Sequence, residues 1–124
     1  MLIIFERKIL RKIYGPIKDG NLWRIRSNLE LSKLYKEKDI VNIIKTKRIQ
    51  WLGHLERMSE TRATKKIYRG RVEGKRGVGR PRKRWLDEVE QDLKRMKVRN
   101  WRSKTKDRTK WSRIVKEARV LHGL

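Results

Sequence analysis

Residues 39–58 read DIVNIIKTKRIQWLGHLERM, and this stretch carries the strongest fold signal in the chain. Its apolar side chains recur at spacings of three, four and seven, the period of one helix face. They are Ile40, Ile43, Ile44, Trp51, Leu52, Leu55 and Met58. Asp39 fits the N-cap position, whereas Gly53 costs about 1 kcal/mol relative to alanine inside a helix. We therefore predict a helix over 39–58, with these basic residues mostly on its other side: Lys45, Lys47, Arg48 and Arg57.

The segment before this helix is expected to be helical as well. Residues 2–14 place apolar side chains at mostly helical spacing, and Gly15-Pro16 ends that helix because proline disfavours helix in the residue before it. Asp19-Gly20-Asn21 is a turn signal. A short helix, in one piece or two, is expected around 22–36. The apolar side chains at helical spacing in the first of these helices are Ile3, Phe5, Ile9, Leu10 and Ile13. The buried candidates of the second are Trp23, Leu29, Leu31 and Leu34.

Two more helical regions are expected near the C-terminus. Residues 85–96 carry acidic side chains early and basic side chains late, a polarity that suits the helix dipole. Asn100 is the expected cap of the last helix. The inner faces of these two regions are formed by Trp85, Leu86, Val89, Leu93 and Met96, and by Trp101, Arg108, Trp111, Ile114, Val115 and Ala118. Because no segment alternates apolar and polar residues as a strand does, the predicted fold class is all-α.

Residues 62–84 differ in kind from the helical parts on either side. This window of 23 residues holds eleven basic residues and a single acid, Glu73. Glycine and proline interrupt it, at Gly70, Gly74, Gly77, Gly79 and Pro81. Its apolar surface is too small to offset the entropy of ordering it, so we expect a mobile linker that is extended rather than helical. The predicted organisation is two small helical bodies, residues 1–60 and 85–124, joined by a basic linker at 61–84.

The composition narrows the classes of function. Of the 124 residues, 37 are Lys or Arg and 14 are Asp or Glu, which gives a formal net charge of +23. No apolar run approaches the roughly 18 residues of a membrane span, and the apolar start is too short for a signal-peptide core. The chain has no cysteine and two histidines, which excludes disulfides, thiolate zinc sites and a histidine-rich metal site.

So much positive charge repels itself unless a polyanion lies nearby, and nucleic acid is the expected partner. An anionic membrane surface is the lesser alternative. We expect a chain that is not secreted, that acts in the nucleus or otherwise in the cytoplasm, and that carries no cofactor. Its oligomeric state is left open.

Gly79-Arg80-Pro81 lies in the middle of the basic run. Such a tripeptide can lie extended in a narrow A·T-rich minor groove, where the arginine enters the negative potential. The motif resembles the core of an AT-hook, although Val78 stands where an arginine is usual. The alternative is a generic phosphate-binding or nuclear-import cluster. The candidate nucleic-acid contacts are Lys75, Arg76, Arg80, Arg82, Lys83, Arg84, Arg48 and Arg57.

Three other features each have a structural and a functional interpretation. The first is a cluster of four acidic residues, Asp87, Glu88, Glu90 and Asp92. We expect them to stabilise the start of a helix through its dipole, ahead of binding Mg²⁺. For His54, packing on the apolar helix face is expected ahead of a phosphate contact. The five tryptophans continue apolar stripes, so core packing is expected ahead of stacking on unpaired bases.

No catalytic constellation is present in the sequence. It has no Gly-rich phosphate loop with Lys-Ser/Thr, no supported Ser/His/Asp set and no Tyr-x-Asp-Asp polymerase motif. We therefore expect no enzymatic activity from this chain on its own.

Several short sequence blocks, taken in chain order, resemble the region that follows the polymerase core in non-LTR retrotransposon endonuclease–reverse transcriptases. These are the proteins of RTE-like, LINE-type elements. The blocks are FERKILRKIYGP at 5–16, LWRIR at 22–26, RIQWLGHLERM at 48–58, GKRGVGRPRKRW at 74–85, and a tail with Asn100-Trp101-Arg102, Asp107-Arg108, Trp111 and Gly123-Leu124. The likeness covers nearly the whole chain. The Trp-Leu-Gly-His and Gly-Arg-Pro-Arg blocks are its most specific parts.

The resemblance implies a fragment of such a protein that lacks its endonuclease and RNA-directed DNA polymerase domains. The chain departs from relatives that carry cysteine–histidine knuckles, and it has Ala63-Thr64 where the family often has proline. The implied role is a non-catalytic tail that binds template RNA or target DNA and docks on the polymerase. The alternatives are a structural or interaction module, a domesticated basic chromatin factor, or a non-functional element remnant.

Overall fold

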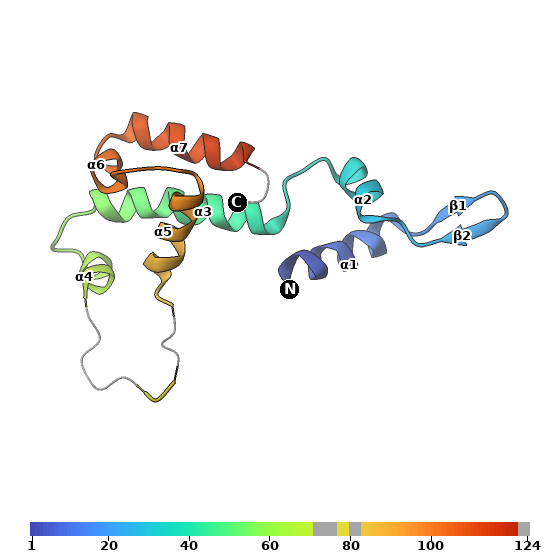
Figure 1. Ribbon diagram of the computed structural model, residues 1–124, viewed down its shortest axis with the longest axis horizontal. Helices are drawn as coiled ribbons and strands as arrows, with labels where there is room; N and C mark the ends of the chain where they lie inside the picture. Colours follow the sequence, from blue (N-terminus) through green and yellow to red (C-terminus); the bar gives the residue numbers. More distant parts are fainter. Residues whose placement is uncertain (71–76, 80–82, 122–124) are drawn as a thin grey trace. The chain divides into compact units, whose positions relative to one another are not determined.

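The computed structural model describes residues 1–70, 77–79 and 83–121. Regular structure within them comprises seven helices and one two-stranded hairpin (Figure 1). The elements are α1 Leu2–Tyr14, β1 Ile17–Asp19, β2 Leu22–Arg24, α2 Asn28–Tyr35, α3 Ile40–Arg57, α4 Ala63–Arg69, α5 Trp85–Arg95, α6 Trp101–Thr105 and α7 Arg108–Val120. The prediction of a mostly helical fold is confirmed, and the hairpin is an addition to it.

The chain divides into two compact units, Met1–Ile43 and Ile44–Leu124, which we call unit 1 and unit 2. The predicted organisation places the whole helix of residues 39–58 in the first body. In the structure, most of α3 belongs to unit 2, because its buried side chains pack with α5 and α7.

Unit 1 contains a hairpin that the sequence pattern does not predict. β1 and β2 pair antiparallel, with Ile17 opposite Arg24 and Asp19 opposite Leu22, so that Gly20 and Asn21 form a two-residue turn. Gly20 has a φ of 63°, which glycine adopts without strain. The predicted helix over 22–36 is therefore wrong at its start, and only α2 is helical. Strands of three residues are too short to show an alternating pattern.

Hydrogen bonds, more than an apolar core, hold unit 1 together. Leu31 is its one buried apolar side chain among the described residues, whereas the predicted core residue Trp23 is 66% exposed. Arg11 Nε donates to the carbonyl of Arg26 at 3.2 Å, and Arg26 Nε donates to the carbonyl of Gly15 at 3.0 Å. The apolar face of α1 is left largely open, with these side chains exposed: Leu2, Phe5, Ile9 and Ile13.

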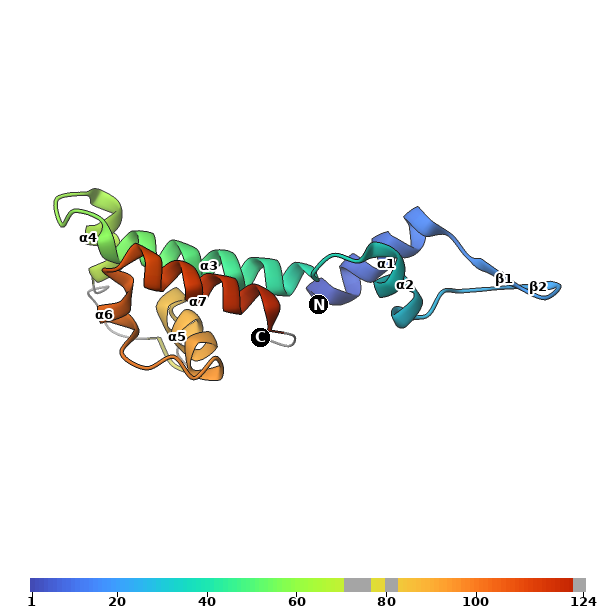
Figure 2. The same cartoon turned by 90° about the horizontal axis from the view of Figure 1, so that it is seen from above.

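The core of unit 2 forms where α3, α5 and α7 meet, and α7 runs alongside α3 in both views (Figures 1 and 2). Its buried side chains are Ile49, Leu52, Val89, Leu93, Trp111, Ile114, Val115 and Ala118. Ile49 replaces Trp51 in the predicted stripe, and Trp51 is 50% exposed. The two residues stand two positions apart, about 200° around a helix, so they cannot face the same core.

The start of α3 follows its sequence signal. Asp39 Oδ1 accepts a hydrogen bond from the backbone N–H of Asn42 at 2.8 Å, as an N-cap residue does. Gly53 has a low helix propensity, and it lies under the ring of Trp111. The indole N–H of Trp111 donates to the carbonyl of Ile49 at 2.9 Å. The absence of a side chain at Gly53 is therefore what allows α7 to approach α3.

α4 contradicts the prediction that residues 61–84 are extended throughout. Lys65 is completely buried, and its ammonium donates to the carbonyls of Leu55 at 2.7 Å and Glu56 at 2.9 Å. Both carbonyls lie in the last turn of α3, where helix carbonyls run out of partners; that of Leu55 also accepts from the backbone N–H of Met58 at 3.2 Å. A positive charge there also suits the helix dipole. Lys65 thus contributes to the fold as a cap. Residues 71–76 and 80–82 of the predicted linker lie outside the described residues.

The C-terminal part follows its predicted faces with three corrections. Val89 and Leu93 of α5 are buried as expected. The last helical region is two helices, because Asp107 Oδ1 accepts from the backbone N–H of Thr109 at 2.9 Å and starts α7 anew. Asn100 makes no side-chain cap hydrogen bond. Arg108, predicted to face inward, is exposed.

Candidate nucleic-acid interface

The face of α3 that the core leaves open carries an open hollow of about 620 Å³. A smaller hollow of about 210 Å³ adjoins it, since His54 and Arg57 line both. We call their combined lining the basic surface: Lys47, Gln50, Trp51, His54, Arg57, Met58, Ser59, Arg62 and Arg108. Its residues on α3 recur every three or four positions, so they form one stripe along the helix.

The basic surface contains four arginine or lysine side chains and no carboxylate among its lining residues. Lys47 and Arg57 come from α3, Arg62 precedes α4, and Arg108 begins α7. Cations from three separate segments therefore converge on one place. Such a concentration of one sign of charge attracts an anionic ligand and raises its local concentration.

Arg57 occupies a fixed position in this surface. Its Nη1 donates to the backbone carbonyl of Thr105 at 2.7 Å. Burial and the nearby positive charge of Arg108 both lower the pKa of Arg57. Two like charges held this close repel each other, and an anion between them would relieve that repulsion.

An aromatic pair lies beside these cations. The rings of Trp51 and His54 have centroids 5.0 Å apart and are inclined at 44°. Trp51 is 50% exposed, and His54 is exposed as well. His54 thus lies beside the apolar face, which runs through Ile49, Leu52 and Leu55, and its ring contacts Trp51 at the surface and is not buried in the core.

The tryptophans divide between core and surface. Trp111 is buried, and Trp101 packs against the core at partial exposure. Trp23, Trp51 and Trp85 are exposed, so the expectation that all five pack in the core is wrong for these three. Their rings are open to a ligand.

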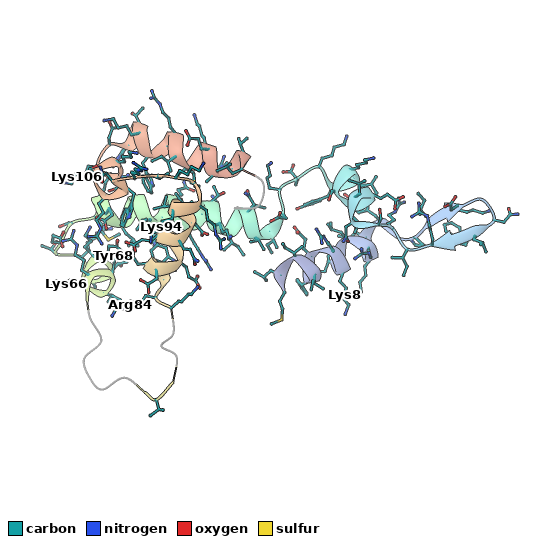
Figure 3. The ribbon with its side chains drawn as sticks, in the orientation of Figure 1. Lys8, Lys66, Tyr68, Arg84, Lys94 and Lys106 are labelled. Carbon is teal, nitrogen blue, oxygen red and sulfur yellow. The ribbon has the colours of Figure 1, made fainter. Side chains whose placement is uncertain are left out.

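The structure separates the residues that the sequence groups as nucleic-acid contacts. Arg48 lies off the basic surface and pairs with Glu88 of α5 at 2.8 Å. It stands nine residues, or two and a half helical turns, from Arg57. Lys83 Nζ lies 3.4 Å from the amide oxygen of Gln91, and Arg84 is at the start of α5 (Figure 3). Four of the predicted contacts lie outside the described residues: Lys75, Arg76, Arg80 and Arg82.

Sequence reasoning misses three basic contributors to this surface. Lys47 is detectable in principle, since Lys47, Gln50, His54 and Arg57 repeat at helical spacing on the face opposite Ile49. Arg62 falls within the predicted extended linker. Arg108 has no local signal, because its position depends on how α7 packs against α3.

The acidic group of α5 is engaged within the protein. Asp87 Oδ2 accepts from the backbone N–H of Arg84 at 3.0 Å. Asp92 lies 3.5 Å from Lys45, and Glu90 lies 3.9 Å from Arg102. No group of three or more His, Asp or Glu among the described residues could hold a metal ion. Nor does any helix in the described part have the length and apolar character to cross a membrane.

The chain was compared with protein-family models, with curated proteins and with solved structures, and none of them matches it. The resemblance to retrotransposon reverse transcriptases therefore stays a prediction from sequence blocks. The geometry of the basic surface is the observation on which a function can be built.

Proposed function

We propose that this chain is a non-catalytic nucleic-acid-binding module that holds the phosphate backbone of RNA or DNA on its basic surface. One observation carries the proposal: cations from three segments surround an exposed Trp51–His54 pair, and no carboxylate lines the surface. A net charge of +23 adds long-range attraction for the same ligand.

The basic surface would act mainly through phosphate contacts. Each arginine or lysine that neutralises a phosphate releases a condensed counterion, and this release drives binding at low salt. Arg57 would contact a phosphate from a fixed position, because its guanidinium donates a hydrogen bond to the carbonyl of Thr105. Lys47, Arg62 and Arg108 are exposed and adapt to the strand that binds.

The basic run around Gly79-Arg80-Pro81 is a second proposed contact region. Lys83 and Arg84 at its end are exposed. Its seven basic residues from 71 to 84 would extend the footprint beyond the basic surface. Arg80 would provide the minor-groove contact if the AT-hook interpretation holds.

The sequence resemblance supports an origin in the tail of a retrotransposon reverse transcriptase. In that case the ligand is template RNA or target DNA, and the site of action is the nucleus. The exposed apolar face of α1 favours a second role as an interaction module, since a helix in water normally buries such a face. In a full-length protein this face would dock on the polymerase domain.

A salt titration tests the proposed function. Binding of a labelled 20-mer duplex is measured by fluorescence anisotropy, for the wild type and for the triple variant Arg57→Ala, Arg62→Ala, Arg108→Ala. The log–log salt slope should become shallower by up to about 2.7, at roughly 0.9 for each phosphate that the variant no longer neutralises.

The matched control is the triple variant Lys8→Ala, Lys12→Ala, Lys18→Ala. It removes the same charge from exposed positions of unit 1. If binding depends on net charge alone, both triple variants shift the slope equally, and the basic surface is not the binding site. A wild type without salt-dependent binding would contradict the proposed function itself.

A further inference from the structure

A second hollow on unit 2 is walled by aromatic side chains. It measures about 790 Å³, within the range of sites that take small ligands or parts of larger ones. Trp51 of α3, Tyr68 of α4 and Trp85 of α5 all line it. We call it the aromatic groove; Tyr68 and Arg84, both labelled in Figure 3, mark two of its sides.

The walls of the aromatic groove leave apolar surface open to water. Trp51 is 50% exposed, Trp85 is 36% exposed and Ile67 is 79% exposed. Exposed apolar surface concentrated in a concave place marks a binding site more often than chance exposure. The three rings supply flat faces from three different helices.

The polar groups of the groove select the charge of its ligand. Arg69, Arg84 and Arg102 line it. Arg84 forms no ion pair with a described carboxylate, whereas Arg69 lies 3.1 Å from Glu60. The one carboxylate in the lining, Glu56, accepts the hydroxyl hydrogen of Tyr68. The groove therefore combines flat aromatic faces with an excess of positive charge.

Trp51 joins the groove to the basic surface, because it lines both. A strand whose phosphates lie on Lys47 and Arg57 would thus have a stacking face beside it. The bases of a duplex are paired and stacked on one another, so they do not reach such a face. Unpaired bases do, and stacking on aromatic side chains is how single strands are held without sequence preference.

We propose that the aromatic groove binds the unpaired bases of single-stranded nucleic acid, so that the protein prefers a single strand to a duplex. The inference rests on the proposed function and specifies its ligand. Trp85 provides the stacking face, Arg84 contacts the neighbouring phosphate, and Trp51 continues the path to the basic surface.

The test compares a labelled 12-nucleotide single strand with a duplex of the same sequence, in both RNA and DNA form, at one salt concentration. The variants are Trp85→Ala, Trp85→Phe and, as matched control, Trp23→Ala. Trp23 is an exposed tryptophan of unit 1 outside the groove. Circular dichroism melts show whether each variant is folded.

Loss of one stacking face should weaken single-strand binding by about 5- to 150-fold in Trp85→Ala. Duplex binding should change by less than about two-fold, Trp85→Phe should retain most of the affinity, and Trp23→Ala should match the wild type. The RNA and DNA arms identify which single strand is preferred.

Three results would overturn the inference, and they differ in what they leave of the proposed function. If the wild type binds duplex and single strand equally, or if Trp85→Ala leaves single-strand affinity unchanged, the groove is filled by something else, such as a partner peptide or a segment of this chain. The proposed function then survives. If the wild type binds neither nucleic acid, both proposals fail together.

Discussion

Trp111 packs directly onto Gly53, so closely that a Cβ built on the glycine would lie 2.2 Å from Cδ1 and Nε1 of the indole ring. The same ring is 2% exposed and donates its N–H to the carbonyl of Ile49. One glycine thus sets how near α7 comes to α3, and with it the position of Arg108 beside Arg57.

Gly53→Ala should destabilise unit 2 even though alanine favours the helix. The added methyl group must displace the ring and strain its hydrogen bond, and overpacking of this kind costs about 1–3 kcal/mol. The gain in helix propensity offsets about 1 kcal/mol of that. Urea unfolding followed by tryptophan fluorescence measures the net loss.

Gly77→Ala is the matched control, because a Cβ there would meet nothing within 4 Å. Its free energy of unfolding should equal that of the wild type within about 0.5 kcal/mol, as for surface substitutions in general. Equal stability of Gly53→Ala and Gly77→Ala would show that the ring adjusts freely.

Lys65→Met should destabilise unit 2 by about 1–3 kcal/mol, since the carbonyl of Glu56 loses its donor and that of Leu55 keeps only the backbone N–H of Met58. Methionine keeps the apolar stem, so the change isolates the ammonium group. Lys66→Met, at an exposed position, is the control for this substitution.

A second measurement tests the burial of Lys65 in the folded wild type. Brief acetylation followed by mass spectrometry should modify Lys66 and spare Lys65; equal labelling of both would contradict the burial of Lys65.

Acid should weaken unit 1 through Glu30. The hydrogen bond from Arg24, followed by that from the backbone N–H of Ser27, lowers the pKa of Glu30 from 4.5 to about 2. Because the folded pKa lies below the unfolded one, the stabilisation is present above about pH 4.5 and is lost as the pH falls toward 2. An NMR titration of the Glu30 carboxyl should show its pKa rising in Arg24→Met. An unchanged pKa would remove Arg24 as the cause.

Alkali should weaken unit 2 through Tyr68. Burial, then the hydrogen bond to Glu56, raises the pKa of Tyr68 above its ordinary value. The neutral phenol is therefore favoured in the folded state, and the free energy of unfolding should fall as the pH rises above about 10, where the unfolded phenol ionises. Urea unfolding at pH 9 and pH 11 should show a smaller fall in Tyr68→Phe. An equal fall would assign the effect to other groups.

The basic run and the basic surface should contribute separately to binding. Replacing Arg80, Arg82, Lys83 and Arg84 with alanine should make the salt slope for duplex DNA shallower by up to about 3.6. If Arg80 reads the minor groove, Arg80→Ala alone should also cost about 1 kcal/mol of preference for A·T-rich over G·C-rich duplex. An unchanged slope in the quadruple variant would leave the basic surface as the sole contact region.

Local signals predict where elements begin and end. Asp39 caps α3, and Gly15-Pro16 ends α1, because each of these effects depends on neighbours along the chain. The hairpin at 17–24 escapes prediction, since its strands are too short for an alternating pattern. Its Gly20-Asn21 turn is readable, but the pairing on either side is not.

The candidate site is harder to predict because it depends on packing between distant segments. In the sequence, Lys65 is one of many lysines expected at the surface. Its burial depends on the end of α3, which places two carbonyls within hydrogen-bond distance of its ammonium. Trp51 and Ile49 are both apolar residues of one helix, and only the packing of α5 and α7 decides which is buried. Charge density points to residues 75–84, whereas the basic surface gathers fewer cations from three places.

The hydrogen bond between Trp111 and Ile49 spans 62 residues of chain. A ribosome adding about 5–20 residues per second needs about 3–12 s to make that stretch. During this delay α5 is the only one of the two packing partners of α3 to be made, and the side of α3 that packs against α7 is open to chaperones and to aggregation. A stop codon or frameshift anywhere before codon 111 would leave that side open permanently, because the product would lack the α7 part of the unit 2 core: Trp111, Ile114, Val115 and Ala118. Truncated products should therefore fold unit 2 completely only when the whole of α7 is present.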